Sequence, residues 1–221
     1  AGAPDEGAPL PWVEDVAPDT LVLPPHDPED PVALPDGVDI RVAALNVYGF
    51  RKATPEAIGA FLATLGADVV ALSEMREASL ETVAQAAGLP HATFAGDKAL
   101  LSATPLGNVR DVPLVNGRSL LHATLDVRGI ALSVYATHIS WDLAGTHQAR
   151  QIVDAVLPAD PLPHLVMLGD FNDEHLSSQN TILETVLADA FTTRGWYPGQ
   201  KVTWPSTGFD ETEGAQTIDL V

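Results

Sequence analysis

The sequence predicts an α/β fold, and three observations support this prediction. From residue 39 onward, apolar β-like runs alternate with segments of helical periodicity. The runs 119–127 and 130–138 are joined by Arg128-Gly129, a two-residue connection typical of a β-hairpin. Hydrophobic residues make up 46% of the 221 residues and charged residues 19%, as in folded globular chains. The mixture of hairpins and helical crossovers favours two packed sheets with helices outside, although periodicity alone gives only the α/β class.

The first half of the domain contains well-marked helices between short strands. Thr54-Pro55 starts a helix, because Thr supplies a capping hydroxyl and Pro suits the first helical position. Gly66 and Gly88 are placed to end the two helices of this half. The predicted strands are residues 40–47, 68–74 and 99–102, and the predicted helices are residues 54–65 and 79–87.

The second half begins with the predicted hairpin and continues through a helix at residues 146–157. This helix has one apolar stripe at helical spacing. An apolar strand at 164–168, a helix at 178–190 and a strand-like run at 217–221 complete the predicted elements. The stripe consists of Ala149, Ile152, Val153, Val156 and Leu157.

Residues 1–38 predict an extended leader or linker ahead of the domain at residues 39–221. Their prolines deny the backbone regular hydrogen bonding, and docking along the domain is the less favoured alternative. A first residue Ala1 agrees with removal of a leader and export, extracellular or periplasmic, but equally with a cloning boundary. No apolar run approaches about 18 residues, so no transmembrane segment is expected. The absence of cysteine excludes disulfides, thiolate metal sites and a Cys nucleophile.

The chain is strongly acidic. Its 11 basic and 30 acidic residues give a net charge of −19, which repels polyanions and weakens nonspecific nucleic-acid binding. Only three lysines are present, and the sequence shows no basic stripe that would follow a phosphate backbone. This composition counts against a tight, processive nuclease. It is compatible with a phosphoesterase whose divalent ion neutralises the substrate phosphate locally.

Polar residues stand at the ends of five predicted strands. The clearest case is Gly169-Asp170-Phe171-Asn172, where an apolar run ends in a carboxylate and a carboxamide. Active sites of α/β proteins are commonly built at the carboxyl ends of strands. A carboxylate there can take a proton from water, and an amide can hold an anionic oxygen. Such residues also supply oxygen ligands for a hard cation and groups for proton transfer. The other four strands carry Asn46, Glu74, His138 and Asp219.

These motifs, in this order, resemble the endonuclease/exonuclease/phosphatase superfamily of metal-dependent phosphoesterases. The resemblance covers residues from about Asp39 to Val221, with Ser73 where the family commonly has Gln. It implies a four-layer α/β/β/α sandwich, in which two packed mixed β-sheets are flanked by helices. The matching motifs are Asn46-Val47, Ser73-Glu74, Thr137-His138-Ile139, Gly169-Asp170-Phe171-Asn172 and Ile218-Asp219-Leu220.

The resemblance also implies a role for each site residue. Glu74 would ligate Mg²⁺, with Mn²⁺ or Ca²⁺ as alternatives, and Asn46 would orient Glu74 or contact the water shell of the ion. Asp170 would orient and deprotonate the attacking water, while His138 and Asn172 would bind the phosphoryl oxygens. Without the motifs, a structural role is the simpler interpretation of three of these residues. Asn46 would cap a turn, His138 would form a structural hydrogen bond, and Glu74 would pair with an Arg or a helix N-terminus.

One family element, Ser-Asp-His, is absent from the 221 residues. Asp219 would normally hold the His of that element in its useful tautomer. We therefore expect a C-terminally incomplete domain, with one or more C-terminal strands missing, which is either part of a longer parent chain or artificially truncated. The predicted activity is hydrolysis of a phosphate ester, with a small phosphodiester, a phosphomonoester, a lipid headgroup or nucleic acid as the candidate substrates. The alternative is a catalytically incomplete family member that acts as a binding or scaffold module.

Overall fold

The computed structural model describes residues 38–173, 177–190 and 219–220, and these contain two β-sheets. The predicted leader lies outside the described residues except for Val38. The first sheet has four strands in the order β1 (Val42–Asn46), β2 (Val69–Ser73), β4 (Lys98–Ser102) and β3 (His91–Ala95). The second has five strands in chain order, namely β5 (Gly107–Pro113), β6 (Ser119–Val127), β7 (Ile130–His138), β8 (Leu165–Asp170) and β9 (Asp219–Leu220).

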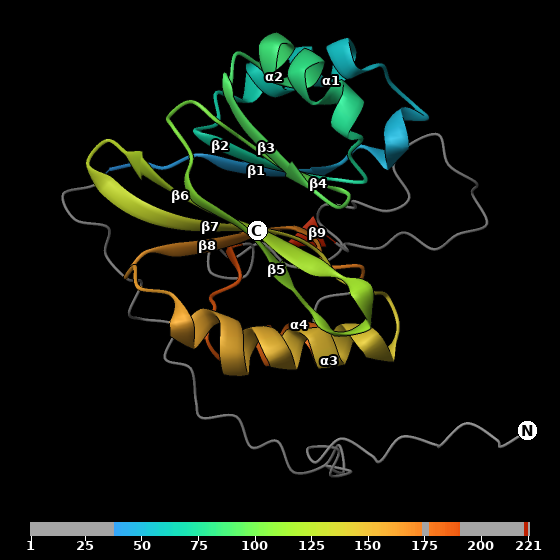
Figure 1. The fold of residues 1–221 in the computed structure, drawn as a ribbon, viewed down its shortest axis with the longest axis vertical. Coiled ribbons are helices and arrows are strands. Elements are labelled where there is room, and N and C mark those ends of the chain that lie inside the picture. The colour runs from blue at the N-terminus through green and yellow to red at the C-terminus, as the bar shows by residue number, and fades with distance from the viewer. Residues whose placement is uncertain (1–37, 174–176, 191–218, 221) are drawn as a thin grey trace, which may run out of the picture. The chain divides into compact units, whose positions relative to one another are not determined.

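Both sheets are mixed, and helices cover their outer faces. The pairs β1–β2 and β7–β8 are parallel, whereas the other neighbouring strands are antiparallel. Figure 1 shows α1 (Pro55–Leu65) and α2 (Leu80–Ala87) above the first sheet, and α3 (Leu143–Gln151) and α4 (Ser178–Leu183) below the second. The predicted four-layer α/β/β/α sandwich is therefore confirmed. Within the described part of the chain, every helix is too short or too polar to cross a membrane.

Side-chain alternation along the strands produces three separate cores. In β2, Val70 and Leu72 pack against α1 and α2, while Val69 and Ala71 pack between the two sheets. In β7, Val134 packs between the sheets and Tyr135 belongs to the core under α3 and α4. Because successive side chains of a strand point to opposite faces, a strand that is buried on both sides is almost wholly apolar. This explains the uninterrupted apolar runs in the sequence.

Local signals in the sequence fix several element boundaries. The Thr54 hydroxyl accepts a hydrogen bond from the backbone N–H of Ala57, and Gly66 ends α1 in the left-handed conformation at φ 59°. In the β6–β7 hairpin, Arg128 (φ 54°) and Gly129 (φ 87°) both have positive φ, as a two-residue type I′ turn requires. The predicted hairpin and the first two helices are confirmed.

Some elements differ from the sequence-based prediction. Strands β3 and β5 were not predicted, because β5 is mostly exposed and β3 is a short, partly buried strand whose apolar alternation is limited to Ala92 and Phe94. Helix α3 starts at Leu143, since Asp142 caps it, and continues through a π-helical turn at Ile152–Val156. Pro158 follows this turn, and its ring and missing N–H disfavour further α-helix. Helix α4 ends at Leu183 rather than at residue 190.

Candidate active site

The candidate site lies where β1, β2, β7 and β8 end at one edge of the two sheets. Asn46, His138 and Asp170 occupy the strand positions that face the neighbouring sheet, in the same alternation as the core residues Ala136 and Leu168. Apolar side chains therefore fill the space between the sheets, and polar side chains replace them at its end. Asp170 is 2% exposed and His138 is 7% exposed. Buried polar groups of this kind need partners, which the following contacts supply.

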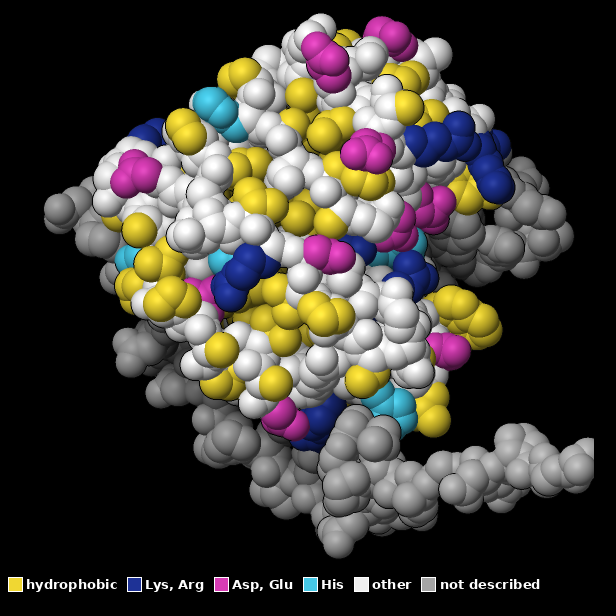
Figure 2. Space-filling model, viewed as in Figure 1, with side chains coloured by type: hydrophobic (Ala, Val, Ile, Leu, Met, Phe, Trp, Pro, Cys, Tyr) yellow, Lys and Arg dark blue, Asp and Glu magenta, His cyan; other side chains and the backbone are white. Residues whose placement is uncertain are grey.

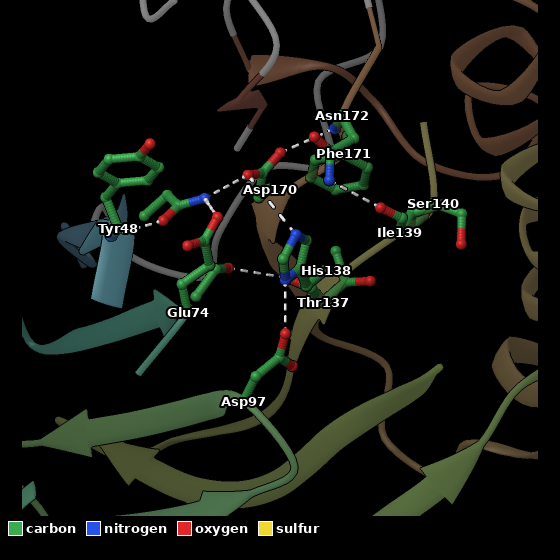
Figure 3. A network of polar contacts seen from close by, with 12 residues as sticks. Tyr48, Glu74, Asp97, Thr137, His138, Ile139, Ser140, Asp170, Phe171 and Asn172 are labelled. Carbon is green, nitrogen blue, oxygen red and sulfur yellow. Dashed lines mark hydrogen bonds and ion pairs between the residues drawn. The ribbon is translucent and has the colours of Figure 1, made fainter. Parts of the chain in front are cut away.

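Asn46 links the two carboxylates of the site, Glu74 and Asp170, which Figure 3 labels. The Nδ2 atom of Asn46 donates to Asp170 Oδ2 at 2.7 Å and to Glu74 Oε1 at 3.0 Å. Its Oδ1 accepts a hydrogen bond from the backbone N–H of Tyr48 at 2.8 Å. An amide nitrogen carries two hydrogens, so Asn46 uses both of them to hold the two anions together. The Asn46 side chain thus orients Glu74 and Asp170.

The Gly-Asp-Phe-Asn segment turns sharply at the end of β8. The backbone N–H of Asn172 donates to Asp170 Oδ1 at 2.8 Å, and Asn172 Nδ2 donates to the carbonyl of Ile139 at 2.9 Å. Gly169 has φ 141°, and a Cβ atom there would lie 2.9 Å from the Thr137 nitrogen and closer still to the Thr137 oxygen. Only glycine fits this approach to β7, which places Asp170 beside His138.

His138 belongs to a second polar group that includes Asp97, a residue that the sequence analysis did not single out. Asp97 Oδ2 lies 2.7 Å from His138 Nδ1 and 3.3 Å from an Arg118 guanidinium nitrogen, and Asp97 Oδ1 accepts from Lys98 Nζ at 3.0 Å. On the other side of the ring, His138 Nε2 is 3.9 Å from Asp170 Oδ2. His138 therefore stands between two carboxylates.

The charge state of Asp97 fixes the orientation of the imidazole. Burial acts to raise the pKa of Asp97, but its hydrogen bond with His138 and the nearby charge of Lys98 outweigh burial and hold the pKa well below its usual range. An ionised Asp97 accepts the Nδ1 proton of His138, which directs Nε2 toward Asp170. Asp97 occupies the turn between β3 and β4. The Gly96-Asp97 pair between two runs that end at Ala95 and begin at Lys98 is the sequence signal that would have revealed it.

The donor set fits a hard divalent cation that keeps much of its water. Two carboxylates, Glu74 and Asp170, converge on one amide group. Mg²⁺ in proteins is usually bound by one or two carboxylates together with several water molecules. Among the described residues, no group of three or more His, Asp or Glu side chains is arranged to hold a metal. Asp219 pairs through its backbone with Asp170 at the β8–β9 ladder. The Asp219 side chain lies outside the described atoms.

The structure thus brings together five of the six predicted site residues. Asn46, Glu74, His138, Asp170 and Asn172 meet at one edge, and the backbone of Asp219 lies next to Asp170. Chemically, the site offers carboxylates that can take a proton, an oriented imidazole, and amide and guanidinium donors for an anion. This combination suits the hydrolysis of an anionic ester.

Comparisons with known proteins bear on the family and the fold of the chain. Residues 43–216 match the model of the Endonuclease/Exonuclease/phosphatase family. An endonuclease/exonuclease/phosphatase family protein from Leptotrichia buccalis C-1013-b is similar in structure, with a TM-score of 0.61, 15% identity, and coverage of 82% of this chain and 86% of that chain. No curated protein matches the sequence.

Two further solved structures share the fold. TDP2 from D. rerio, complexed with single strand DNA product, has a TM-score of 0.62 at 16% identity and covers 82% of each chain. Sphingomyelinase C from Streptomyces griseocarneus has a TM-score of 0.50 at 20% identity, with 65% of this chain and 68% of that chain covered. At these identities the likeness concerns the fold alone.

Proposed function

The chain belongs to the endonuclease/exonuclease/phosphatase family, and we propose that it hydrolyses a phosphodiester by divalent-metal-dependent attack of water on phosphorus. The observation that carries this proposal is the Asn46 amide, which holds Glu74 and Asp170 together beside the His138 ring. Glu74 and Asp170 converge on one amide, so their negative charges repel each other, and a cation bound at Glu74 would reduce that repulsion. A metal-binding hydrolytic site accounts for that arrangement.

Asp170 is the proposed general base. Each of its carboxylate oxygens already accepts one hydrogen bond, from Asn46 Nδ2 and from the Asn172 N–H. Because a carboxylate oxygen has two lone pairs, each oxygen keeps one for a water molecule. The two existing hydrogen bonds fix the carboxylate plane, so a water bound there is aimed in a constant direction. Proton transfer to Asp170 would then create the attacking hydroxide.

His138 and Asn172 are the proposed phosphate-binding groups. The His138 Nε2 faces Asp170 across 3.9 Å, which is too long for a hydrogen bond. With Nδ1–H directed at Asp97, Nε2 can donate to a substrate oxygen when the ring carries both protons. Asn172 Nδ2 has one hydrogen engaged by the Ile139 carbonyl and a second one for an anionic oxygen. When bound at Glu74, Mg²⁺, Mn²⁺ or Ca²⁺ would neutralise the phosphate and stabilise the leaving oxygen.

The proposed substrates are a small phosphodiester, a lipid headgroup or nucleic acid. This range agrees with the names of the structurally similar proteins, one of which is a complex with a DNA product and another a sphingomyelinase C. The net charge of −19 disfavours long-range attraction of a polyanion, so a substrate with few phosphates is favoured.

The test is the metal dependence of bis(p-nitrophenyl) phosphate hydrolysis. We expect turnover with Mg²⁺ or Mn²⁺, its loss with a chelator, and its return when metal is added back. Glu74→Gln should raise the metal concentration for half-maximal rate by at least about 100-fold, since a carboxylate ligand is lost. The exposed neighbour Glu77→Gln changes charge equally and should behave as the wild type. Turnover that survives chelation, or equal metal dependence in both variants, would contradict the proposal.

A further inference from the structure

Two arginines contact the short turn that follows Asn46 in the sequence. We propose that Arg51 and Arg76, with the turn at Tyr48–Phe50, form a subsite for a second phosphate of the substrate. This inference rests on the proposed function and narrows its substrate class to compounds with two phosphate groups. The second phosphate comes either from the next nucleotide of a strand or from another phosphate of a small molecule.

Both guanidinium groups flank the same turn. The Arg51 guanidinium carbon lies 5.0 Å from the centre of the Tyr48 ring, and an Arg51 guanidinium nitrogen is 3.4 Å from the Tyr48 hydroxyl. An Arg76 guanidinium nitrogen lies 3.4 Å from the position that a Cβ atom would take at Gly49. The two cations are therefore held on neighbouring parts of one short segment.

This turn is rigidly attached to the catalytic residues. Tyr48, Gly49 and Phe50 have φ values of 48°, 56° and 61°, three left-handed residues in succession. Such a backbone is strained and persists only where other contacts impose it. Here the Tyr48 N–H donates to Asn46 Oδ1 and the Phe50 N–H donates to the Val47 carbonyl at 2.9 Å. The hydrogen bond that orients Asn46 is thus the one that fixes the turn.

Among the described residues, Arg51 and Arg76, like Arg41, Arg110 and Arg150, differ from three other basic residues in having no carboxylate partner. Lys98, Arg118 and Arg128 each pair with an Asp carboxylate. Within the described residues, the exposed Arg51 and Arg76 form no ion pair with a carboxylate, although the chain carries 30 acidic residues. Figure 2 shows Lys and Arg side chains gathered next to Asp and Glu side chains at the right-hand edge of the described part. Guanidinium groups without an internal anion are suited to bidentate binding of phosphate.

The position of the two arginines favours a second phosphate over the scissile one. The scissile phosphate would lie among Glu74, Asp170 and His138, where Arg118 is the neighbouring arginine and contacts Asp97. Arg51 and Arg76 instead contact Tyr48 and Gly49 in the turn that follows Asn46, and within the described residues neither forms a hydrogen bond or ion pair with Glu74, Asp170 or His138. A substrate with a single phosphate gains nothing from them, whereas a second phosphate on the same molecule would meet both.

The test compares two chromogenic substrates that differ by one phosphate. These are the p-nitrophenyl ester of thymidine 5′-phosphate and the same ester with an additional 3′-phosphate. Arg51→Gln and Arg76→Gln should each lower kcat/KM for the two-phosphate ester by about 10-fold, the size of one charge-assisted hydrogen bond, and leave the one-phosphate ester within about twofold. Arg150→Gln, an exposed change of equal charge on α3, is the matched control and should affect neither.

A binding measurement separates this inference from the proposed function. Calorimetry without metal should show that Arg51→Gln and Arg76→Gln each weaken binding of thymidine 3′,5′-bisphosphate by about 10-fold. An equal loss for base-free propane-1,3-diol bisphosphate would show that phosphate alone is recognised, and a loss confined to the nucleotide would identify a strand as the source. If the protein shows no turnover but its binding of the bisphosphate still depends on Arg51 and Arg76, the proposed function is refuted and the subsite is supported. Equal effects on both esters, or unchanged binding, would overturn the subsite.

Discussion

Replacing Asn46 with Asp tests whether this residue holds two carboxylates together. Aspartate has nearly the same shape and keeps the oxygen that accepts the Tyr48 N–H. The donor nitrogen becomes a carboxylate oxygen, 2.7 Å from Asp170 Oδ2 and 3.0 Å from Glu74 Oε1. The substitution therefore converts two attractive contacts into two repulsive ones without altering the packing.

The size of the effect follows from these distances. At an effective dielectric constant of about 20, unit charges separated by 2.7 Å repel by about 6 kcal/mol, and the 3.0 Å pair is similar. Protonating one carboxylate costs less, about 4 kcal/mol at pH 7 for an ordinary Asp, so the variant takes up a proton instead. The folded state of N46D thus binds more protons than the unfolded state. Its pH-dependent loss of stability is about 4 kcal/mol at pH 7 and vanishes near pH 4.

Urea unfolding at several pH values in the presence of a chelator measures this effect. The stability difference between wild type and N46D should grow by about 1.4 kcal/mol per pH unit between pH 4 and pH 7. Asn116→Asp, at an exposed left-handed position, makes the same chemical change and should show a difference below about 0.5 kcal/mol. A difference for N46D that does not change with pH, or no loss of stability at pH 7, would refute the reasoning.

Three other perturbations have distinct expected outcomes. Gly169→Ala should lose at least about 3 kcal/mol of stability, because the added Cβ would collide with the β7 backbone. Gly117→Ala has open space around it and should lose about 1 kcal/mol. Equal losses of stability in thermal unfolding would contradict the β7–β8 packing. Asp97→Asn should lower kcat by about 10- to 100-fold and change the pH dependence of kcat, because His138 loses the partner of its Nδ1. A variant that merely unfolds more easily would keep the wild-type pH dependence of kcat. Burial and the nearby Arg110 lower the pKa of His122, so as pH falls the unfolded state takes up a proton at this residue before the folded state does. The stability of the wild type should therefore decline as pH falls below about 6.5. His122→Gln should abolish this pH dependence of stability in denaturant unfolding between pH 7 and pH 5, and an unchanged pH dependence would contradict the prediction.

The parts of the fold that the sequence predicted are those with local physical signals. The β6–β7 hairpin was predicted because Arg128-Gly129 can adopt two positive φ angles between two β-like runs. Helix α1 was predicted because Thr54 caps it and Gly66 ends it. The exposed strand β5 offered no such signal, since it pairs through its backbone while its side chains face solvent.

The site was predictable to the extent that its residues stand at strand ends. Asn46, His138 and Asp170 could be placed at one edge from the strand pattern and the family resemblance. Asp97 was missed, because its Gly96-Asp97 turn follows β3, a strand that the sequence analysis did not predict. The contact of Arg51 and Arg76 with the same turn could not be predicted either. These residues are far apart in the sequence, and the left-handed residues of the Tyr48–Phe50 turn have no clear signal in it.

The most direct test of the account is the rate of phosphodiester hydrolysis by Asp170→Asn. In the account, this carboxylate takes the proton of the attacking water, and an amide of the same shape cannot. With saturating Mg²⁺ or Mn²⁺, and with folding verified by circular dichroism, we predict that kcat/KM for bis(p-nitrophenyl) phosphate falls by at least about 1,000-fold. A variant that is folded, binds metal and hydrolyses the ester at the wild-type rate would contradict the proposed role of Asp170 and, with it, the proposed active site.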